Sequence, residues 1–230
     1  MSNVLDRLTN EELKHNTDKI DVQIQAEGIK ELEEFSKGTF NFTSLIPIPQ
    51  PLLMTCGPLV DLALFAYFVE DKKRNENSST DNSSEQNSLA QSLTEDELIF
   101  LDSLLIKDYR DLDKRYKEHL EKYNNDATRL VDLGEQYFNN CMRYKCLAHH
   151  SWCQKYWGTP LNALSVKVLN DEVSFSTVNG KPLPILKALS IRYPHIRFKC
   201  RILTDDGNYD YIFENGEVIK EDQRELKRTT

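Results

Sequence analysis

Two cysteines and two histidines near the middle of the chain are of the residue types that could hold a metal ion. His149, His150 and Cys153 follow Cys146 by three, four and seven residues, so a helix would carry all four on one face. Thiolate and imidazole are the ligands that zinc prefers. Four side chains on one straight helix cannot readily surround a tetrahedral ion, so we expect buried core cysteines and no metal or cofactor. Residues that would have to complete the shell from elsewhere are Cys56, His195 and Cys200.

The same segment offers one pair for nucleophilic catalysis. Cys146 and His150 lie four residues apart, and a neighbouring basic group can lower the pKa of a thiol. No glycine-led turn for the nucleophile and no loop for an oxyanion accompanies them in the sequence. Glycine-rich nucleotide loops and the paired-histidine motif of metalloproteases are also missing from it. The sequence therefore predicts a protein that is not an enzyme.

A charged stripe in the last third of the chain points instead to binding. Arg197, Lys199 and Arg201 alternate with apolar residues, so a strand would present all three on the face opposite its core. Lys167 could join them from a neighbouring strand. Residues 151–230 hold 12 bases and 10 acids, whereas the whole chain has a net charge of −8. Such a face could bind RNA or single-stranded DNA, although the aromatic residues that stack on bases are missing from it.

The second occupant that would suit this basic face is the chain's own acidic helical insertion or a partner protein. The chain's own helical segment also carries acids of the opposite sign: Asp108, Asp111, Asp113 and Glu118. Because the chain is acidic overall, we favour protein contact over nucleic acid. We predict that the four basic residues, together with Asp108, Asp111 and Asp113, contact a partner, and that this partner is a host protein.

The elements at the N-terminal end follow from the spacing of apolar residues. Alternation from Ile20 to Gln25 predicts a strand with one buried face. Helical spacing from Ile29 to Phe35 predicts a helix that ends at Gly38.

The middle of the chain is predicted to be helical. Apolar spacing from Pro58 to Val69 indicates one helix, and Thr94 with Glu97 forms the capping box of another. Residues 72–92 are rich in polar residues and predict a disordered loop. One helix is expected to run from Asp126 to Trp157.

Past Gly158 the period of the sequence changes to two. An Asn170-Asp171 turn joins two predicted strands, and a further helix follows Pro182. The strands expected in this part are 164–168, 173–177, 196–202 and 209–213.

This order predicts an α+β protein. It is that of a ferredoxin-like split βαβ antiparallel sheet, with a large helical insertion between the first helix and the second strand. The expected parts are residues 1–50 and 159–220 for the two halves of the ferredoxin-like domain, 51–158 for the insertion and 221–230 for a flexible tail.

The block from Trp152 to Ala163 is the most specific feature of the sequence. Together with the Phe-Asn-Phe segment at residues 40–42 and the prolines that follow it, the block resembles the YubB-type ferredoxin-like family of phages and plasmids. The resemblance covers roughly residues 20–50 and 137–220. It implies a mobile-element origin and a fold, with no established catalytic activity. Where that family usually has Lys and Trp after Gly-Thr, this chain has Pro160 and Leu161.

Aromatic residues around this block are expected to be structural. We predict a core that includes Trp152, Trp157, Gly158, Phe175 and Phe198, with Gly158 ending the preceding helix.

The sequence also bears on where in the cell the protein acts. No run of about 18 apolar residues and no secretory signal appears, so we expect a cytoplasmic protein without a membrane partner. We expect a non-catalytic adaptor or inhibitor from a mobile genetic element, countering a host defence system as anti-CRISPR proteins do. The alternative is a module that binds RNA or single-stranded DNA.

Overall fold

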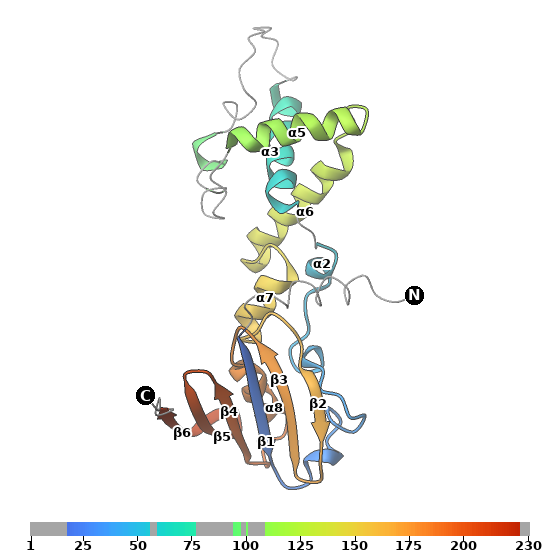
Figure 1. Ribbon diagram of the computed structural model, residues 1–230. Coiled ribbons are helices and arrows are strands. Elements are labelled where there is room, and N and C mark those ends of the chain that lie inside the picture. The colour runs from blue at the N-terminus through green and yellow to red at the C-terminus, as the bar shows by residue number, and fades with distance from the viewer. Residues whose placement is uncertain (1–17, 56–58, 77–93, 98–99, 101–108, 226–230) are drawn as a thin grey trace. The chain divides into compact units, whose positions relative to one another are not determined.

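The chain folds into two compact units. The computed structural model describes residues 18–55, 59–76, 94–97, 100 and 109–225 (Figure 1). The first, the sheet unit, comprises residues 1–48 and 150–230, and the second, the helical unit, comprises residues 49–149. Most of the predicted loop at 72–92 falls outside the described residues, as do Cys56 and Asp108.

The sheet unit is built on a six-stranded antiparallel sheet. Its order is β2-β3-β1-β4-β5-β6, and every neighbouring pair is antiparallel. The N-terminal strand therefore lies in the middle of the sheet, between two strands from the far end of the sequence. With its helices, the protein is α+β. The strands are β1 (Lys19–Gln25), β2 (Leu164–Val168), β3 (Glu172–Val178), β4 (Phe198–Thr204), β5 (Gly207–Glu214) and β6 (Glu217–Glu225).

One face of this sheet is apolar because the strands alternate. Val22 lies opposite both Phe175 on β3 and Ile202 on β4, and all three are buried. Helix α8 (Leu183–Arg192) covers this face behind the sheet in Figure 1, burying Ile185 and Leu189. The opposite face carries polar side chains and is called the open face below.

The predicted helix after β1 is wrong in length and type. The structure has a 3-10 helix, η1 (Ile29–Glu31), followed by turns up to Gly38. Gly28, which precedes η1, adopts a left-handed conformation and provides no side-chain cap, and the chain is extended again at Leu32. A segment this short cannot offset the cost of nucleating an α-helix without such a cap. Ile29 and Phe35 are buried nonetheless.

An aromatic cluster connects this segment to the Trp152–Ala163 block. Phe40 and Phe42 contact Phe175, and Phe42 meets the ring of Trp157 edge-on at 5.6 Å. A second short 3-10 helix, η2 (Phe42–Ser44), lies here. The indole Nε1 of Trp157 donates a hydrogen bond to the Ile46 carbonyl oxygen at 2.9 Å. Both Trp157 and Trp152 are buried, as are Phe175 and Phe198.

Helix α7 (His149–Tyr156) ends in a close crossing of two chain segments. Gly158 follows it with a φ of 82°, and a side chain there would strike the Lys181 carbonyl oxygen. A Cβ on Gly180 would lie 1.9 Å from the Gly158 carbonyl oxygen. The Thr159 hydroxyl donates to the Val178 carbonyl oxygen at 2.9 Å. The block is thus a backbone junction.

Four described helices form the helical unit. Its core lies between α3, α5 and α6 and includes Phe65, Tyr116 and Tyr137, all fully buried. The backbones of α3 and α6 approach closely, because Gly134 has no side chain: a Cβ there would lie 2.0 Å from the Ala63 carbonyl oxygen. The helices are α2 (Gln50–Leu53), α3 (Val60–Glu76), α5 (Tyr109–Lys122) and α6 (Thr128–Tyr144).

The single helix expected from Asp126 to Trp157 is interrupted. Helix α6 stops at Tyr144, and Lys145 adopts a left-handed conformation with a φ of 56°. The turn exposes the Leu147 carbonyl oxygen to the side chains of Thr55 and Asn140, which both bond to it. The Thr94–Glu97 capping box, in contrast, is confirmed by its two reciprocal hydrogen bonds.

The chain continues as a strand where a flexible tail was predicted. Asn215 and Gly216 form a turn, with φ angles of 48° and 79°. Strand β6 then pairs with β5 as far as Glu225. Within the described residues, no helix has both the length and the apolar character needed to cross a bilayer.

We expect Trp157→Ala to lower the free energy of unfolding by about 3 to 5 kcal/mol, because it removes a buried ring and leaves the Ile46 carbonyl unpaired. Trp157→Phe keeps most of the packing and loses the hydrogen bond, so its cost should be nearer 1 kcal/mol. Thermal melts followed by circular dichroism measure both. An unchanged melting temperature for Trp157→Ala would contradict this account.

We expect Gly134→Ala to destabilise the helical unit by about 1 to 3 kcal/mol, because the added methyl group forces α3 and α6 apart. Gln136→Ala, on the exposed side of the same helix, should change stability by less than about 0.5 kcal/mol. Urea denaturation of both variants checks this. Equal effects of the two substitutions would argue against a close helix crossing.

Candidate binding surface on the open face

The strand register places three of the four predicted basic residues on the open face. Lys167 on β2 lies opposite Ser174 on β3, and Ser174 lies opposite Gln23 on β1. Gln23 in turn lies opposite Arg201 on β4. Residues directly opposite each other project to the same side of a sheet. Lys167 and Arg201 thus share the open face, separated by two strands, and Lys199 lies on it opposite Gln25. Arg197 precedes the first residue of β4.

Two of these cations are neutralised by carboxylates of β5, which was not predicted from the sequence. Arg201 Nε donates to Asp210 Oδ1 at 2.7 Å, and the register places these two residues directly opposite each other. Arg197 Nε donates to Glu214 Oε2 at 2.8 Å. Alternation within β4 shows which side chains are exposed, but it does not show which residues β5 brings beside them.

Lys199 differs from the two arginines. Its register partner on β5 is Ile212, and no carboxylate in the described part of the chain forms an ion pair with it. It is the central basic residue of the open face, and an incoming acidic group would meet it without displacing an existing partner.

A groove of about 250 Å³ runs over β1, β4, β5 and β6 on this face. Its charged side chains are four bases and two carboxylates, a net charge of +2. The charged residues that β6 contributes were not predicted from the sequence: Asp222 and Arg224 fall in the predicted tail at residues 221–230, and Lys220 ends the predicted second half of the domain. The Asn215-Gly216 turn signal indicates a strand after it, but the residues that follow do not alternate between apolar and polar. The charged residues are Lys199, Arg201, Asp210, Lys220, Asp222 and Arg224.

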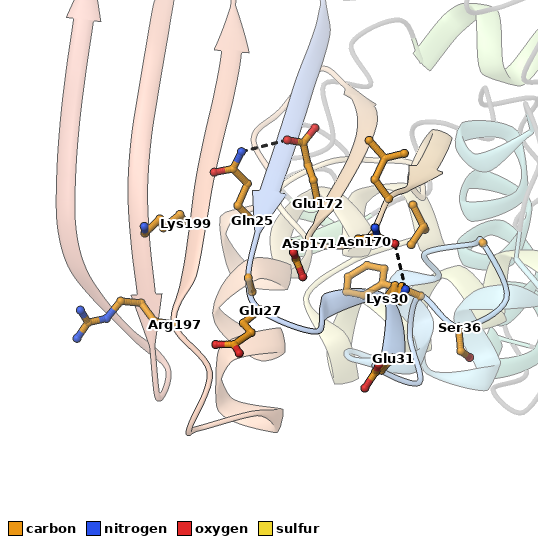
Figure 2. A pocket seen from close by; sticks show the side chains of 15 residues that line it. Gln25, Glu27, Lys30, Glu31, Ser36, Asn170, Asp171, Glu172, Arg197 and Lys199 are labelled. Carbon is orange, nitrogen blue, oxygen red and sulfur yellow. Dashed lines mark hydrogen bonds between the residues drawn. The ribbon is translucent and has the colours of Figure 1, made fainter.

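A larger hollow of about 1230 Å³ lies where β1 ends and β4 begins. Hydrogen bonds connect its walls, as Figure 2 shows: Gln25 Nε2 donates to Glu172 Oε2 and Lys30 Nζ donates to Asn170 Oδ1, each at 3.0 Å. The backbone N–H of Gly28 also donates to Asp171 Oδ1 at 3.2 Å.

The hollow and the groove carry opposite net charges and meet at two residues. Four acids and three bases line the hollow, a net charge of −1. Gln25 and Lys199 line both depressions, so the two form one continuous surface. This surface has a basic end on β6 and an acidic end at the β2–β3 turn. Such an arrangement suits a partner that carries both signs of charge.

Two neighbouring side chains stabilise the charged form of Asp21 on the open face. Ser176 Oγ donates to Asp21 Oδ1 at 2.6 Å, and Lys19 Nζ lies 3.0 Å from the same oxygen. The hydrogen bond from Ser176 and the charge of Lys19 together lower the pKa of Asp21.

The predicted acidic contact residues belong to the helical unit. Asp111 lies 3.5 Å from Arg115 on the same helix, and Glu118 lies 3.8 Å from Lys114. Asp113 is buried and pairs with Lys117 at 3.0 Å, so it is not part of an exposed acidic surface.

The cysteines have the character of core residues. Cys146, Cys153 and Cys200 are buried, and burial raises the pKa of the Cys200 thiol well above its ordinary value. Cys146 precedes α7 and lies outside that helix, so the four residues predicted to share one helical face do not. The part of the chain that the structure describes holds no cluster of three or more metal-ligating side chains, and His195 is exposed.

We expect Ser176→Ala to raise the pKa of Asp21 toward its ordinary value. A carboxyl whose folded pKa is lowered contributes stability above about pH 4, and this contribution is lost as the pH falls through the lowered value. The variant should therefore lose less stability on acidification. NMR titration of the Asp21 carboxyl carbon measures the shift, with Ser174→Ala as the control. A pKa that does not move would show that this hydrogen bond does not hold the charge.

Comparisons with known proteins leave the family of the chain open. No family model matches it, and no curated protein matches it. Among solved structures, it is similar to the crystal structure of protein api92 from Yersinia pseudotuberculosis, whose family model is DUF1281. The identity is 6%, the match covers 92% of this chain and 99% of that one, and the TM-score is 0.35. A similarity this low carries no inference about fold or function.

Proposed function

We propose that the protein is a non-catalytic protein-binding adaptor or inhibitor whose contact surface is the open face of the sheet. The observation that carries this proposal is the charge arrangement of that face. Arg197 and Arg201 are already paired with carboxylates, whereas Lys199 at the centre has no acidic partner among the described residues. A protein surface with both signs of charge can complement such a face, with an acidic side chain opposite Lys199.

The same arrangement disfavours a nucleic-acid backbone as the ligand. Phosphates along the groove would approach Asp210 and Asp222 as well as the bases, and like charges repel. Tyr209 and Tyr211 on β5 lie opposite Ile202 and Cys200, which are buried on the other face of the sheet, so these rings are not available on the open face for stacking. The net charge of +2 in the groove is the observation that keeps RNA or single-stranded DNA as the second candidate.

The scaffold that carries this face is proposed to be ferredoxin-like. The order β2-β3-β1-β4 with antiparallel neighbours supports it, because the split βαβ arrangement places its first strand centrally in this way. In this proposal η1 and its turns stand in place of the first helix, the helical unit is an insertion, and β5–β6 is an added hairpin.

The cellular role is proposed from the resemblance of the Trp152–Ala163 block to the YubB-type family. That resemblance supports an origin in a phage or plasmid and a host protein as the partner. An inhibitor of a host defence system, acting in the cytoplasm, fits such an origin.

We expect Lys199→Glu to reduce capture of the partner by about tenfold or more, because it sets like charges opposite each other. The measurement is quantitative mass spectrometry after affinity purification of the tagged full chain from its natural host, with and without nuclease. Lys199→Arg should keep the interaction, and Lys187→Glu, an equal charge change on the exposed side of α8, should leave it unaltered.

Two results would overturn the proposal. One is capture of the same proteins at the same level by wild type and Lys199→Glu. The other is nuclease-sensitive capture together with tight, salt-dependent binding of labelled RNA or DNA in fluorescence anisotropy that Arg197→Glu abolishes. The second result would establish the nucleic-acid alternative.

A further inference from the structure

The two edges of the sheet differ in how well they could accept another strand. At one edge, the pairing of β2 with β3 shifts register between Leu164 and Lys167, and Ser165 adopts a left-handed φ of 53°. Bulges of this kind disrupt the row of backbone donors and acceptors that an incoming strand needs. Strand β2 therefore presents a poor edge for strand addition.

Strand β6 presents the opposite case. It pairs with β5 in continuous register from Lys220 to Glu225, and its irregular pairing is confined to the stretch before Lys220. No strand pairs with its other side in the part of the chain that the structure describes. A regular strand of this kind leaves alternate backbone N–H and C=O groups available to an extended chain.

The side chains of β6 restrict which chain could pair there. Lys220, Asp222 and Arg224 line the groove of the open face, and their side chains are 59%, 45% and 72% exposed. They present the charge sequence positive, negative, positive along the edge. Opposite charges placed directly across from each other stabilise the pairing of an added strand, and like charges destabilise it.

A second copy of this chain does not satisfy that pattern when the two segments overlap fully. Full antiparallel overlap of the segment Lys220–Arg224 with its own copy centres on Asp222. It sets Lys220 against Arg224 and Asp222 against itself, so every pair on the groove side has like charges. In this fully overlapped register, the edge therefore suits a different sequence better than its own.

We propose that β6 is the docking edge for an extended segment of the protein partner, which adds as a seventh strand. The segment carries an acidic, a basic and an acidic residue at alternate positions on the groove side. This inference rests on the proposed protein-binding function and names its mode: main-chain hydrogen bonds hold the segment, and charges select it. The partner's acidic residues lie over Lys220 and Arg224, beside the groove that contains Lys199.

The test uses two fluorescein-labelled peptides of threonine and valine. One carries glutamate, lysine and glutamate at alternate central positions, and the other carries lysine, glutamate and lysine. Fluorescence anisotropy with the full chain should show saturable binding of the first peptide, about tenfold tighter than the second. The triple variant Lys220→Glu, Asp222→Lys, Arg224→Glu should reverse this preference, and the reversal itself demonstrates that the variant is folded. Lys187→Glu, on the exposed side of α8 and outside the open face, is the matched charge control and should leave the preference unchanged.

Several outcomes would overturn the inference. Equal affinity for both peptides, no saturable binding up to about 1 mM, or the same change of preference with Lys187→Glu would each exclude charge-selected addition at β6. Sedimentation of the wild-type protein as a dimer that the triple variant abolishes would assign the edge to a second copy. If the peptides bind without selectivity but capture of the partner still depends on Lys199, only strand addition is overturned. If the peptides bind selectively but capture does not depend on Lys199, only the proposed contact surface is overturned.

Discussion

The sheet unit depends on the contact between two glycine backbones, at Gly158 and Gly180. No other residue type could stand at Gly180, because any Cβ there would overlap the Gly158 carbonyl oxygen at 1.9 Å. The contact brings the end of α7 against the chain that leaves β3 and enters α8. Thr159 then bonds to the last residue of β3, and Trp157 is held where its indole reaches Ile46. The junction thus holds the chain that leads into β2 against the end of β3.

The open face shows how cross-strand pairing changes what a charged strand can do. A row of unpaired bases would attract any polyanion, and its attraction would extend over about one Debye length. Pairing with Asp210 and Glu214 removes most of that long-range field and leaves short-range polarity. Binding then depends on whether the partner's charges coincide with those of the face, which is a condition on geometry. The open face consequently favours selective binding over high affinity.

Local periodicity predicted the strands well, because the alternation of apolar and polar residues in a strand involves only a few neighbouring residues. The alternation at Ile20–Gln25 and the Asn170-Asp171 turn correspond to β1 and to the β2–β3 hairpin. The helix expected at Ile29–Phe35 was wrong because its apolar spacing is produced by turns that bury the same side chains. The break at Lys145 was not visible in the local spacing, and one hydrogen bond that accompanies it joins Leu147 to Thr55, about 90 residues away.

The candidate site was predicted only in part, for a similar reason. Alternation in β4 was sufficient to place Lys199 and Arg201 on an exposed face, but the neutralising carboxylates come from β5, and register between strands is not visible in either strand alone. Charged residues on both sides of β6 concealed its period, so the part of the groove wall that Asp222 and Arg224 form was predicted to be a tail.

The order of elements along the chain also determines how the protein is made. Strand β1 leaves the ribosome well before the strands that flank it, because the whole helical unit is translated in between. A nascent chain that ends near residue 149 contains every helix that the helical unit needs. The strands that pair with Val22 and Ile24 have not yet been translated at that point. Sheet closure joins Val22 to Ile202, about 180 residues apart, and such non-local pairings form slowly. The apolar N-terminal strand is therefore the segment of the nascent chain that most needs protection by chaperones during translation.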